Sequence, residues 1–354
     1  MTINTPRVGG MGGRGTTSGM SRNQQSVAFP SSELPLALVL GGSRGLGLLI
    51  AQELLMRGHR VVIAARDADE LDRAREQLMG WGPVLVRTCD VRDRQGVREL
   101  VDELEGQVGA IEVLVTVAGV IQVAPLESLT VEHFDEAIET MLWGPVQAAM
   151  TVLPAMRRRG RGRIATITSI GGMVSPPHLL PYATAKFGAV GFSDGLAAAL
   201  TGTGVTATTV VPGLMRTGSQ ERAEFGGIAE HEYAWFAPAA SLPLLSMDAG
   251  RAARRIVDGV LSGRPIVVLT PLAWVGIRVR GLAPGTTTRL MGLANRLLPS
   301  GPDHGGHQLV EGSSAGERLA SRTVHALTVL GRRAAARNNE PEGARPPEVP
   351  RRVR

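Results

Sequence analysis

The sequence predicts an α/β fold in which helices cover both faces of a doubly wound, Rossmann-like parallel sheet. Three observations support this class. Apolar runs of strand length alternate with segments of helical length and period. The apolar runs are continuous in Val, Ile and Leu, as expected for strands that are buried on both faces. A glycine cluster stands between the first run and the first helical segment, where the chain needs a sharp turn.

Each element can be assigned in order along the chain. The expected strands are 36–41, 60–65, 83–89, 112–118, 162–168, 204–211 and 265–270. The expected helices are 46–58, 68–79, 92–107, 130–159, 180–201 and 247–262. Together they define a single domain over residues 35–270.

The alternation is interrupted at residues 213–246. This segment follows the sixth strand and contains a large share of the aromatic residues in the chain: Phe225, Tyr233, Trp235 and Phe236. One interpretation is a substrate lid over the carboxyl edge of the sheet, where ligands of such folds bind. The alternative is a helical excursion that simply packs on the domain.

The two ends differ in composition from the domain. Residues 1–34 offer almost no apolar side chains to offset the entropy lost on ordering, so we expect a disordered leader. Residues 271–337 should form a helical extension, with an amphipathic, acid-free stretch over 271–300 and a second helix over 315–336. The Pro- and Arg-rich residues 338–354 should form a disordered tail.

Charge and cysteine content exclude several classes of function. The whole chain has a net charge of +6, yet residues 36–270 carry −3, so the domain offers no basic surface for nucleic acid. The single cysteine, Cys89, excludes an internal disulfide and is typical of a reducing compartment. Its place in an apolar strand favours a packing role.

No signal peptide or membrane span is expected from the sequence. The first thirty residues lack an apolar core, and the longest apolar run, 265–277, is too short to cross a bilayer. We therefore expect a cytoplasmic protein. The close histidine pair His304 and His307 flanks two glycines without a clear carboxylate set, so no metal site is expected.

The turn after the first strand reads Gly41-Gly42-Ser43-Arg44-Gly45-Leu46-Gly47 and opens a helix. Glycine lets the backbone turn tightly and approach a pyrophosphate, while the helix N-terminus supplies amide donors and a favourable dipole. The spacing Gly-x-x-x-Gly-x-Gly resembles the short-chain dehydrogenase/reductase family. The resemblance implies that the loop holds a dinucleotide through Gly41, Ser43, Arg44, Gly45, Leu46 and Gly47.

The end of the second strand indicates which dinucleotide is expected. NAD-binding sites normally place an acidic residue at this strand tip to hold the ribose hydroxyls. Here Ala65 stands in that place and Arg66 follows it, with Arg44 in the glycine loop. Two guanidinium groups can grip a 2′-phosphate that an acid would repel. In the family that this chain resembles, a basic residue at either position accompanies NADP(H), so we expect NADP(H) as the cofactor.

The strongest motif is Tyr182-Ala183-Thr184-Ala185-Lys186. Residues four apart lie on one face of a helix, and an ammonium beside a phenol favours phenolate. The pKa of Tyr182 should therefore fall from its reference value near ~10 towards the working range. The phenol can then exchange a proton with a carbonyl or an alcohol while hydride moves to or from nicotinamide. Lys186 is the only lysine beside 37 arginines, which makes a chance pairing rare.

The resemblance covers residues 36–270 and assigns a third catalytic position. Ser169 lies thirteen residues before Tyr182 and matches the serine that orients the substrate oxygen. The neighbouring Thr168 is suited instead to capping or packing. In the same pattern Lys186 also holds the cofactor ribose. The resemblance further implies seven strands in the order 3-2-1-4-5-6-7 and a homo-oligomer.

Other cofactor contacts are implied by the same resemblance. Asp90 and Val91 match an adenine-contacting pair, although Asp90 is equally suited to cap the helix that follows. Further contacts are expected from the end of the fourth strand and from a Pro-Gly-x-x-x-Thr turn, at Ala118, Gly119, Pro212, Gly213 and Thr217.

The chain departs from the family pattern at three places. Leu40 stands where a threonine usually precedes the first glycine, and Thr116-Val117 replaces an asparagine pair before Ala118. Met141 stands where the family has an asparagine that positions a water for the lysine, and no asparagine occurs between positions 23 and 295. We expect reduced turnover, with a proton route through Thr140 or backbone carbonyls.

The expected function is hydride transfer between NADP(H) and a hydrophobic ketone, aldehyde or secondary alcohol. The expected pocket is apolar: Ile170, Met173, Val174, Leu179, Leu180, Met215 and the aromatic residues of 225–236. The alternative is an NADP(H)-binding regulatory or interaction protein with little catalysis. The acid-free stretch 271–300 could also contact an anionic membrane weakly, or pack on the domain or a second subunit.

Overall fold

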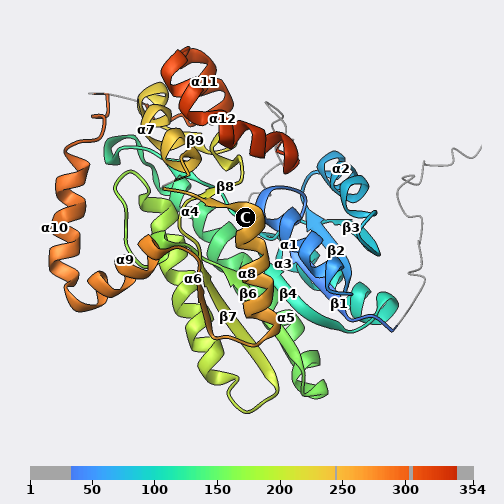
Figure 1. The fold of residues 1–354 in the computed structure, drawn as a ribbon. Helices are drawn as coiled ribbons and strands as arrows, with labels where there is room; N and C mark the ends of the chain where they lie inside the picture. The colour runs from blue at the N-terminus through green and yellow to red at the C-terminus, as the bar shows by residue number, and fades with distance from the viewer. Residues whose placement is uncertain (1–32, 244, 303–305, 341–354) are drawn as a thin grey trace, which may run out of the picture.

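A seven-stranded parallel sheet forms the centre of the molecule (Figure 1). The computed structural model describes residues 33–243, 245–302 and 306–340. The strands lie in the order β3-β2-β1-β4-β6-β7-β11, which confirms the predicted fold class and strand order. Their bounds are β1 Leu36–Leu40, β2 Arg60–Ala65, β3 Val84–Thr88, β4 Ile111–Thr116, β6 Gly162–Ile167, β7 Val205–Val211 and β11 Ile266–Val268.

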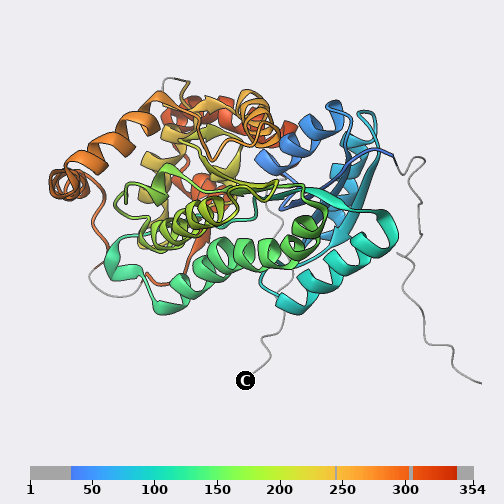
Figure 2. The same cartoon turned by 90° about the horizontal axis from the view of Figure 1, so that it is seen from below.

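Helices cover both faces of this sheet (Figure 2). One face packs against α1 (Gly45–Met56), α2 (Ala68–Leu78) and α8 (Ala249–Leu261). The other face packs against α3 (Arg94–Glu103), α5 (Gly144–Arg159) and α6 (Leu180–Ala199). A π-helical turn, η1 (Leu104–Val108), extends α3, and α4 (Val131–Ile138) packs on α6.

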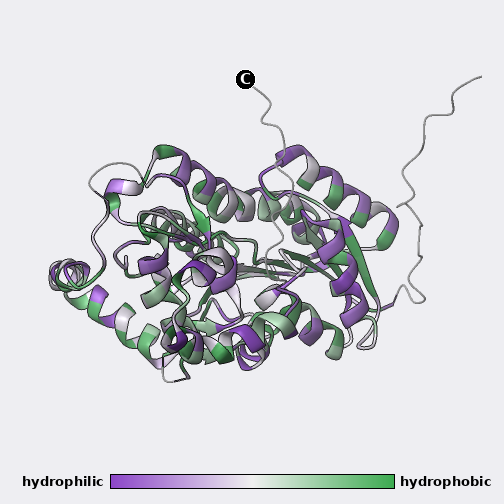
Figure 3. Ribbon diagram, turned by 90° about the horizontal axis from the view of Figure 1, so that it is seen from above, coloured by the Kyte–Doolittle hydropathy of each residue, from purple (hydrophilic) through white to green (hydrophobic). Residues whose placement is uncertain are grey.

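The period-two geometry of a strand explains why both faces are apolar. In β1, Ala37 and Val39 enter the core under α1 and α8, whereas Leu36, Leu38 and Leu40 enter the core on the opposite face. All five residues are buried, so a strand of this kind needs apolar side chains at every position. In Figure 3 the strands of the sheet are accordingly green, and the outer faces of the covering helices are largely purple.

The predicted helix 130–159 is interrupted. Helix α4 ends at Ile138, a π-helical turn η3 follows over Glu139–Trp143, and α5 begins at Gly144. A π turn widens the backbone by one residue and often marks a functional site. Met141, which replaces the family asparagine, lies in this turn and is buried.

The segment 213–246 packs as its own small unit. It contains β8 (Met215–Arg216), a 3₁₀ turn η5 (Ser219–Glu221), β9 (Glu224–Phe225) and α7 (Ala229–Ser241), and β8 pairs with β10 (Met247–Asp248). Strand β9 joins β5 (Gln122–Val123) and β12 (Val310–Glu311) in a three-stranded sheet. Phe225, Tyr233 and Phe236 are buried in a common core with Ala315 of the extension.

That packing favours the second interpretation of the aromatic residues. The ring of Phe225 packs edge to face against those of Tyr233 and Phe236, and the three rings fill a core instead of lining an open pocket. The predicted pocket therefore loses these three residues. Whether the segment moves as a lid stays a prediction.

The extension is more divided than expected. Helices α9 (Pro271–Leu282) and α10 (Pro284–Asn295) confirm helical structure over 271–300. The single helix predicted over 315–336 is wrong, because Ala320 takes a left-handed conformation and Ser321 caps a new helix. The two parts are α11 (Gly312–Leu319) and α12 (Arg322–Arg337), both packed on α7.

The predicted ends can be checked only in part. Residues 338–340 were expected to be disordered but are buried against the glycine loop, because their amide and carboxyl groups find partners there. Residues 1–32 and 341–354 lie outside the described part of the chain. Within the described part, none of the helices combines the length and the apolar character needed to span a membrane.

Candidate active site

Tyr182 and Lys186 share one face of α6 near the end of β6. The Nζ atom of Lys186 lies 5.8 Å from the centroid of the Tyr182 ring. It donates a hydrogen bond of 2.8 Å to the carbonyl oxygen of Ile167, the last residue of β6. Lys186 is the only lysine in the sequence, and it is 5% exposed. Its ammonium group therefore lies inside the domain.

Ser169 lies beside this pair. It follows β6, and its Oγ accepts a hydrogen bond of 2.9 Å from the amide of Gly171. A Cβ atom added to Gly171 would lie 2.9 Å from Cε1 of Tyr182 and 3.4 Å from Oγ of Ser169. Glycine at 171 thus leaves the space in which the Ser169 and Tyr182 side chains meet. The adjacent Thr168 is buried and donates to the carbonyl oxygen of Val210.

The pKa of Tyr182 differs from the prediction. Burial raises it above the usual value for a phenol, and hydrogen bonding with Ser169 lowers it only in part. The ammonium group of Lys186 donates instead to the carbonyl oxygen of Ile167, and burial lowers the pKa of Lys186 to about 8. The predicted lowering of the Tyr182 pKa is therefore not found in this state of the protein.

The glycine loop has the geometry that a dinucleotide cradle needs. Gly41 has a φ of +89°, and a side chain there would collide with the backbone of Ala118 at the end of β4. Gly45, with a φ of +55°, opens α1 and is followed by the buried Leu46 and Gly47. The loop thus presents a helix N-terminus at the sheet edge, where an anionic group is favoured. In type and shape these residues fit a dinucleotide.

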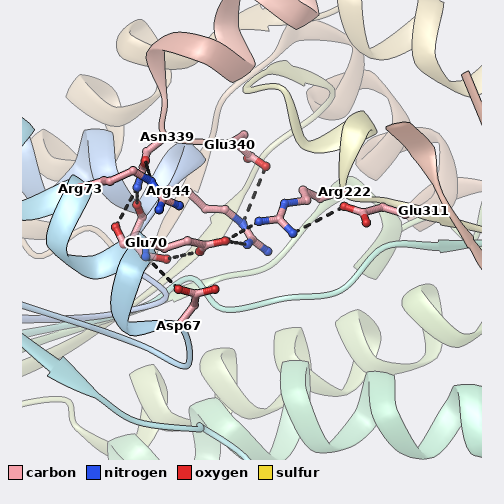
Figure 4. Close-up of polar contacts among 9 residues, drawn as sticks. Arg44, Asp67, Glu70, Arg73, Arg222, Glu311, Asn339 and Glu340 are labelled. Atoms are coloured by element: carbon pink, nitrogen blue, oxygen red, sulfur yellow. Dashed lines mark hydrogen bonds and ion pairs between the residues drawn. The ribbon is translucent and has the colours of Figure 1, made fainter. Parts of the chain in front are cut away.

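Arg44 is not free in the manner predicted. Its guanidinium forms an ion pair of 2.7 Å with Glu70 and lies 3.7 Å from the carboxylate of Glu340 (Figure 4). Glu70 also pairs with Arg222 and accepts from the hydroxyl of Ser43 at 3.1 Å. A phosphate that binds Arg44 must therefore compete with two carboxylates, which the sequence did not show.

Arg66 is exposed at the tip of β2. Among the described residues, no hydrogen bond or ion pair engages its side chain. Its positive charge lies near Asp90, whose pKa it helps to lower. Arg66 is therefore the better candidate of the two predicted arginines for a 2′-phosphate.

Asp90 does not cap a helix. Its carboxylate accepts from the backbone and side chain of Arg92, with an ion pair of 2.7 Å. Asp93 caps α3 instead, because its side chain accepts from the amide of Gln95. Burial acts to raise the pKa of Asp90, but the hydrogen bonds from Arg92 outweigh it and hold the pKa low. Val91 packs beneath Gly144.

The predicted Pro-Gly-x-x-x-Thr turn follows β7 beside Ser169. The carbonyl of Pro212 accepts a hydrogen bond of 2.7 Å from the amide of Ile170. Gly213 packs against Thr270, where a side chain would collide. Thr217 is buried, and its hydroxyl accepts from the amide of Ser219 at 3.2 Å. The turn is thus held close to Ser169, and its contact with a cofactor stays a prediction.

Met141 packs against Tyr182. It forms a small buried cluster with Ala137, Ala185 and Tyr182, and its sulfur would lie 3.4 Å from a Cβ on Gly119. The neighbouring hydroxyl of Thr140 is buried and has no hydrogen-bond partner among the described residues. An unpaired buried hydroxyl is suited to bind a water, which keeps Thr140 a candidate for the proton route.

Sequence reasoning missed several residues near the site. Asn338, Asn339 and Glu340 lie against the glycine loop, but their composition resembles a tail, so no local signal predicted their burial. His178 was also missed: it has a φ of 61° and lies 2.8 Å from a carboxylate oxygen of Glu232 in α7. This contact ties α7 to the loop before Tyr182.

The thiol of Cys89 is buried. Burial raises the pKa of Cys89 to about 11, which fits a packing role for this thiol. In the described residues, no cluster of three or more His, Cys, Asp or Glu side chains is arranged to hold a metal ion. Asp303 and His304 of the predicted loop lie outside the described residues.

Comparison with known proteins agrees with this geometry. The family model described as short chain dehydrogenase matches residues 35–225. A putative ketoacyl reductase of Streptomyces coelicolor is 37% identical over 198 residues, which is 54% of this chain and 74% of the relative. A 3-oxoacyl-[acyl-carrier-protein] reductase, MabA, of Mycobacterium avium is 36% identical over 180 residues, which is 51% of this chain and 67% of the relative.

The fold is also that of solved structures. A variant of the actinorhodin polyketide ketoreductase with NADPH superposes with a TM-score of 0.59 at 29% identity, covering 70% of this chain and 98% of that one. A short-chain dehydrogenase of Streptomyces avermitilis gives a TM-score of 0.63 at 24% identity, covering 74% and 98%. On the sheet order, the glycine turn and the match over 35–225, the chain belongs to the short-chain dehydrogenase/reductase family of oxidoreductases.

Proposed function

We propose that this protein reduces a hydrophobic ketone or aldehyde, or oxidises the corresponding secondary alcohol, with NADP(H). The observation that carries the proposal is the convergence of Ser169, Tyr182 and Lys186 at the end of β6, beside the glycine loop edge of the sheet. These three side chains come from two segments, the loop after β6 and helix α6, and a purely structural role would not need all three polar groups in one buried place.

The residues have distinct roles in this proposal. When bound, the nicotinamide supplies or accepts a hydride at the carbonyl carbon. Tyr182 donates its phenolic proton to the carbonyl oxygen during reduction, and Ser169 orients that oxygen by a hydrogen bond. Lys186 in its ammonium form favours the phenolate left behind and holds the ribose. Ile167 keeps the lysine in place through its carbonyl oxygen.

NADP(H) is preferred over NAD(H) because of charge at the tip of β2. Ala65 replaces the acid that would hold ribose hydroxyls, and Arg66 is exposed beside it. Arg44 supplies a second guanidinium to the 2′-phosphate when its ion pairs with Glu70 and Glu340 break. Cofactor contacts are proposed at the other positions assigned from the sequence, including Asp90, Thr217 and the backbone at Ala118 and Gly119.

An apolar substrate fits the surroundings of Ser169. Ile170 and Val174 follow Ser169 in the chain and pack against Gly276 of α9. Helix α9 therefore borders the side of the site where the substrate is proposed to bind. Relatives named as ketoacyl reductases make a β-ketoacyl thioester a sensible first test compound. Physiological direction follows from the cofactor, since NADPH favours reduction.

A direct test measures NADPH consumption with a panel of ketones, aldehydes and β-ketoacyl thioesters. We expect turnover in the full chain and a loss of about 10²–10⁴-fold in kcat for Tyr182→Phe, with cofactor affinity kept. Tyr233→Phe is the matched control, because Tyr233 lies in the α7 core. Activity that survives in Tyr182→Phe contradicts the proposed role.

The alternative function, an NADP(H)-binding regulatory protein, makes a different prediction. Such a protein binds NADPH in calorimetry but consumes none with any compound of the panel. The intact serine, tyrosine and lysine favour the enzyme.

We also propose that α9 and α10 contact an anionic membrane. The two helices and the turn after α10 expose apolar side chains: Leu272, Trp274, Val275, Val279, Leu282, Leu290, Leu293 and, in the turn, Leu297. Residues 271–302 contain four arginines and no acidic residue. In both Figures 1 and 2 helix α10 lies at the outer edge of the molecule, and it packs chiefly on α9. An exposed apolar surface with arginines complements anionic lipid.

Association of two copies through the same surface is less favourable. A two-fold contact would place the arginines of one copy opposite those of the other, without acids to pair them. The homo-oligomer that the family resemblance implies is therefore proposed through another surface. Light scattering measures the oligomeric state. A cytoplasmic location of the protein is also a proposal.

Flotation with vesicles tests the membrane contact. We expect binding to vesicles with a high share of phosphatidylserine, and loss of binding in the variant Leu282→Glu. The matched control is Leu126→Glu, because Leu126 is similarly exposed but lies outside the extension. Equal flotation of both variants, or assembly into larger oligomers instead of flotation, contradicts the membrane proposal.

A further inference from the structure

We propose that residues 338–340 form a clasp that occupies the phosphate end of the cofactor cradle and must swing away before a dinucleotide binds. This proposal rests on the proposed function, since it concerns regulation of the same site. The clasp is defined as Asn338, Asn339 and Glu340, directly after α12.

The clasp is held by specific hydrogen bonds to the glycine loop. The amide of Gly45 donates to the carbonyl oxygen of Asn338 at 2.8 Å. The side-chain amide of Asn339 donates to the carbonyl oxygens of Ser43 at 2.7 Å and of Glu70 at 2.9 Å. The first two of these bonds use backbone groups of the glycine loop, and the third uses a backbone group of α2. A backbone donor of the cradle is thus already engaged by the protein's own chain.

The clasp also contacts two further elements around the site, helix α2 and the turn after β7. The side-chain amide of Asn338 donates to the carbonyl oxygen of Thr217 at 3.0 Å, and Nε of Arg73 in α2 donates to Oδ1 of Asn339 at 3.2 Å. Thr217 is one of the residues expected from the family resemblance to contact the cofactor. The clasp therefore bridges α2, the glycine loop and the turn after β7, as Figure 4 shows for its contacts with Arg73 and Arg44.

The carboxylate of Glu340 is placed where a phosphate is expected. Its Oε1 atom lies 2.7 Å from the position of a Cβ on Gly45, directly over the start of α1. Arg44 and Arg222 supply positive charge around it, and Glu70 and Glu221 supply negative charge. A helix N-terminus with an arginine favours any anion, so a carboxylate and a phosphate compete for the same place.

The anchoring of the clasp allows it to open without unfolding the domain. Helix α12 ends at Arg337 and is held by α7, so among the described residues the movement can be confined to the three that follow the helix. Burial raises the pKa of Glu340 to about 7, because the nearby charges of Arg44 and Arg222 only partly offset the loss of water around the carboxylate. A dinucleotide offers more negative charge to Arg44 than one carboxylate and can displace it. The apparent affinity for the dinucleotide is then its intrinsic affinity reduced by the fraction of open molecules.

Calorimetric titration of the full chain with NADPH tests the clasp. We compare the natural chain with Glu340→Ala, which removes the carboxylate, and with Asn339→Gly, which removes the amide contacts while glycine accepts the φ of 56° at this position. If about nine molecules in ten are closed, each variant lowers the Kd by up to about tenfold. Glu317→Ala and Asn295→Gly are matched controls, since both residues are exposed in the extension.

Hydrogen exchange gives a second readout that needs no turnover. In the free protein we expect protection at the amides of Gly45 and Glu340, both hydrogen-bonded. On addition of NADPH, protection at Glu340 falls while the loop stays protected. Protection that increases at Glu340 on binding overturns the proposal, as does a Kd unchanged in both variants. If neither the natural chain nor the variants bind NADPH, the proposed function itself fails, a result distinct from equal binding by all of them.

Discussion

Replacement of Lys186 by methionine should stabilise the protein while it abolishes catalysis. Lys186 is 5% exposed, and burial lowers its pKa from 10.5 to about 8. At about 1.4 kcal/mol per pKa unit, this corresponds to about 3 kcal/mol of cost for holding the ammonium in the folded state. Loss of the hydrogen bond to the carbonyl of Ile167 offsets about 1–3 kcal/mol of the gain. The expected net change in the free energy of unfolding at pH 7 is about 0–2 kcal/mol in favour of Lys186→Met.

The free energy of unfolding should depend on pH differently in the natural chain and in Lys186→Met. Because the folded-state pKa of Lys186 is depressed, the unfolded chain binds the additional proton between pH 8 and 10.5. Stability of the natural chain should therefore rise with pH in that window, relative to Lys186→Met. Below pH 8 both states carry the ammonium, so the difference between the two proteins should be constant.

Urea unfolding of both proteins at several values of pH between 7 and 10 measures this difference. Arg163→Met serves as a matched control, because Arg163 is half-buried at the start of β6 and outside the site. A loss of more than about 2 kcal/mol in Lys186→Met at pH 7, or a difference that does not vary with pH, would refute the reasoning about burial. NADPH turnover measured in parallel should fall with the loss of the ammonium that favours phenolate.

Three further predictions follow from the site and its support. Met141→Asn should raise turnover, because an amide in place of the thioether can hold a water near the lysine; unchanged or lower turnover contradicts the relay argument. Arg66→Glu should weaken NADPH more than NADH, by about tenfold or more in Kd, because an acid repels the 2′-phosphate; equal effects on both cofactors contradict that role. Phe225→Ala should lower the free energy of unfolding by about 3–5 kcal/mol in thermal or urea melts, because Phe225 is fully buried; a loss below about 1 kcal/mol shows that its core readily collapses.

The sequence by itself determined the elements that depend on local patterns. Strand and helix positions followed from periodicity, because β1 and its neighbours must be apolar on both faces. The glycine turn, Ser169 and the Tyr182–Lys186 spacing are also local, and the structure places them where the pattern predicted.

Only the tertiary structure decided which groups compete for the same partner. Glu70 lies 26 residues from Arg44 and Glu340 lies 296 residues from it, so their pairing with this arginine has no local signature. The direction of the Tyr182 pKa was likewise decided by burial, which periodicity does not measure. The residues directly after α12 were expected to form a tail, but they are ordered against the site. Their hydrogen bonds to Thr217 and to the glycine loop offset the entropy lost when three polar residues become ordered.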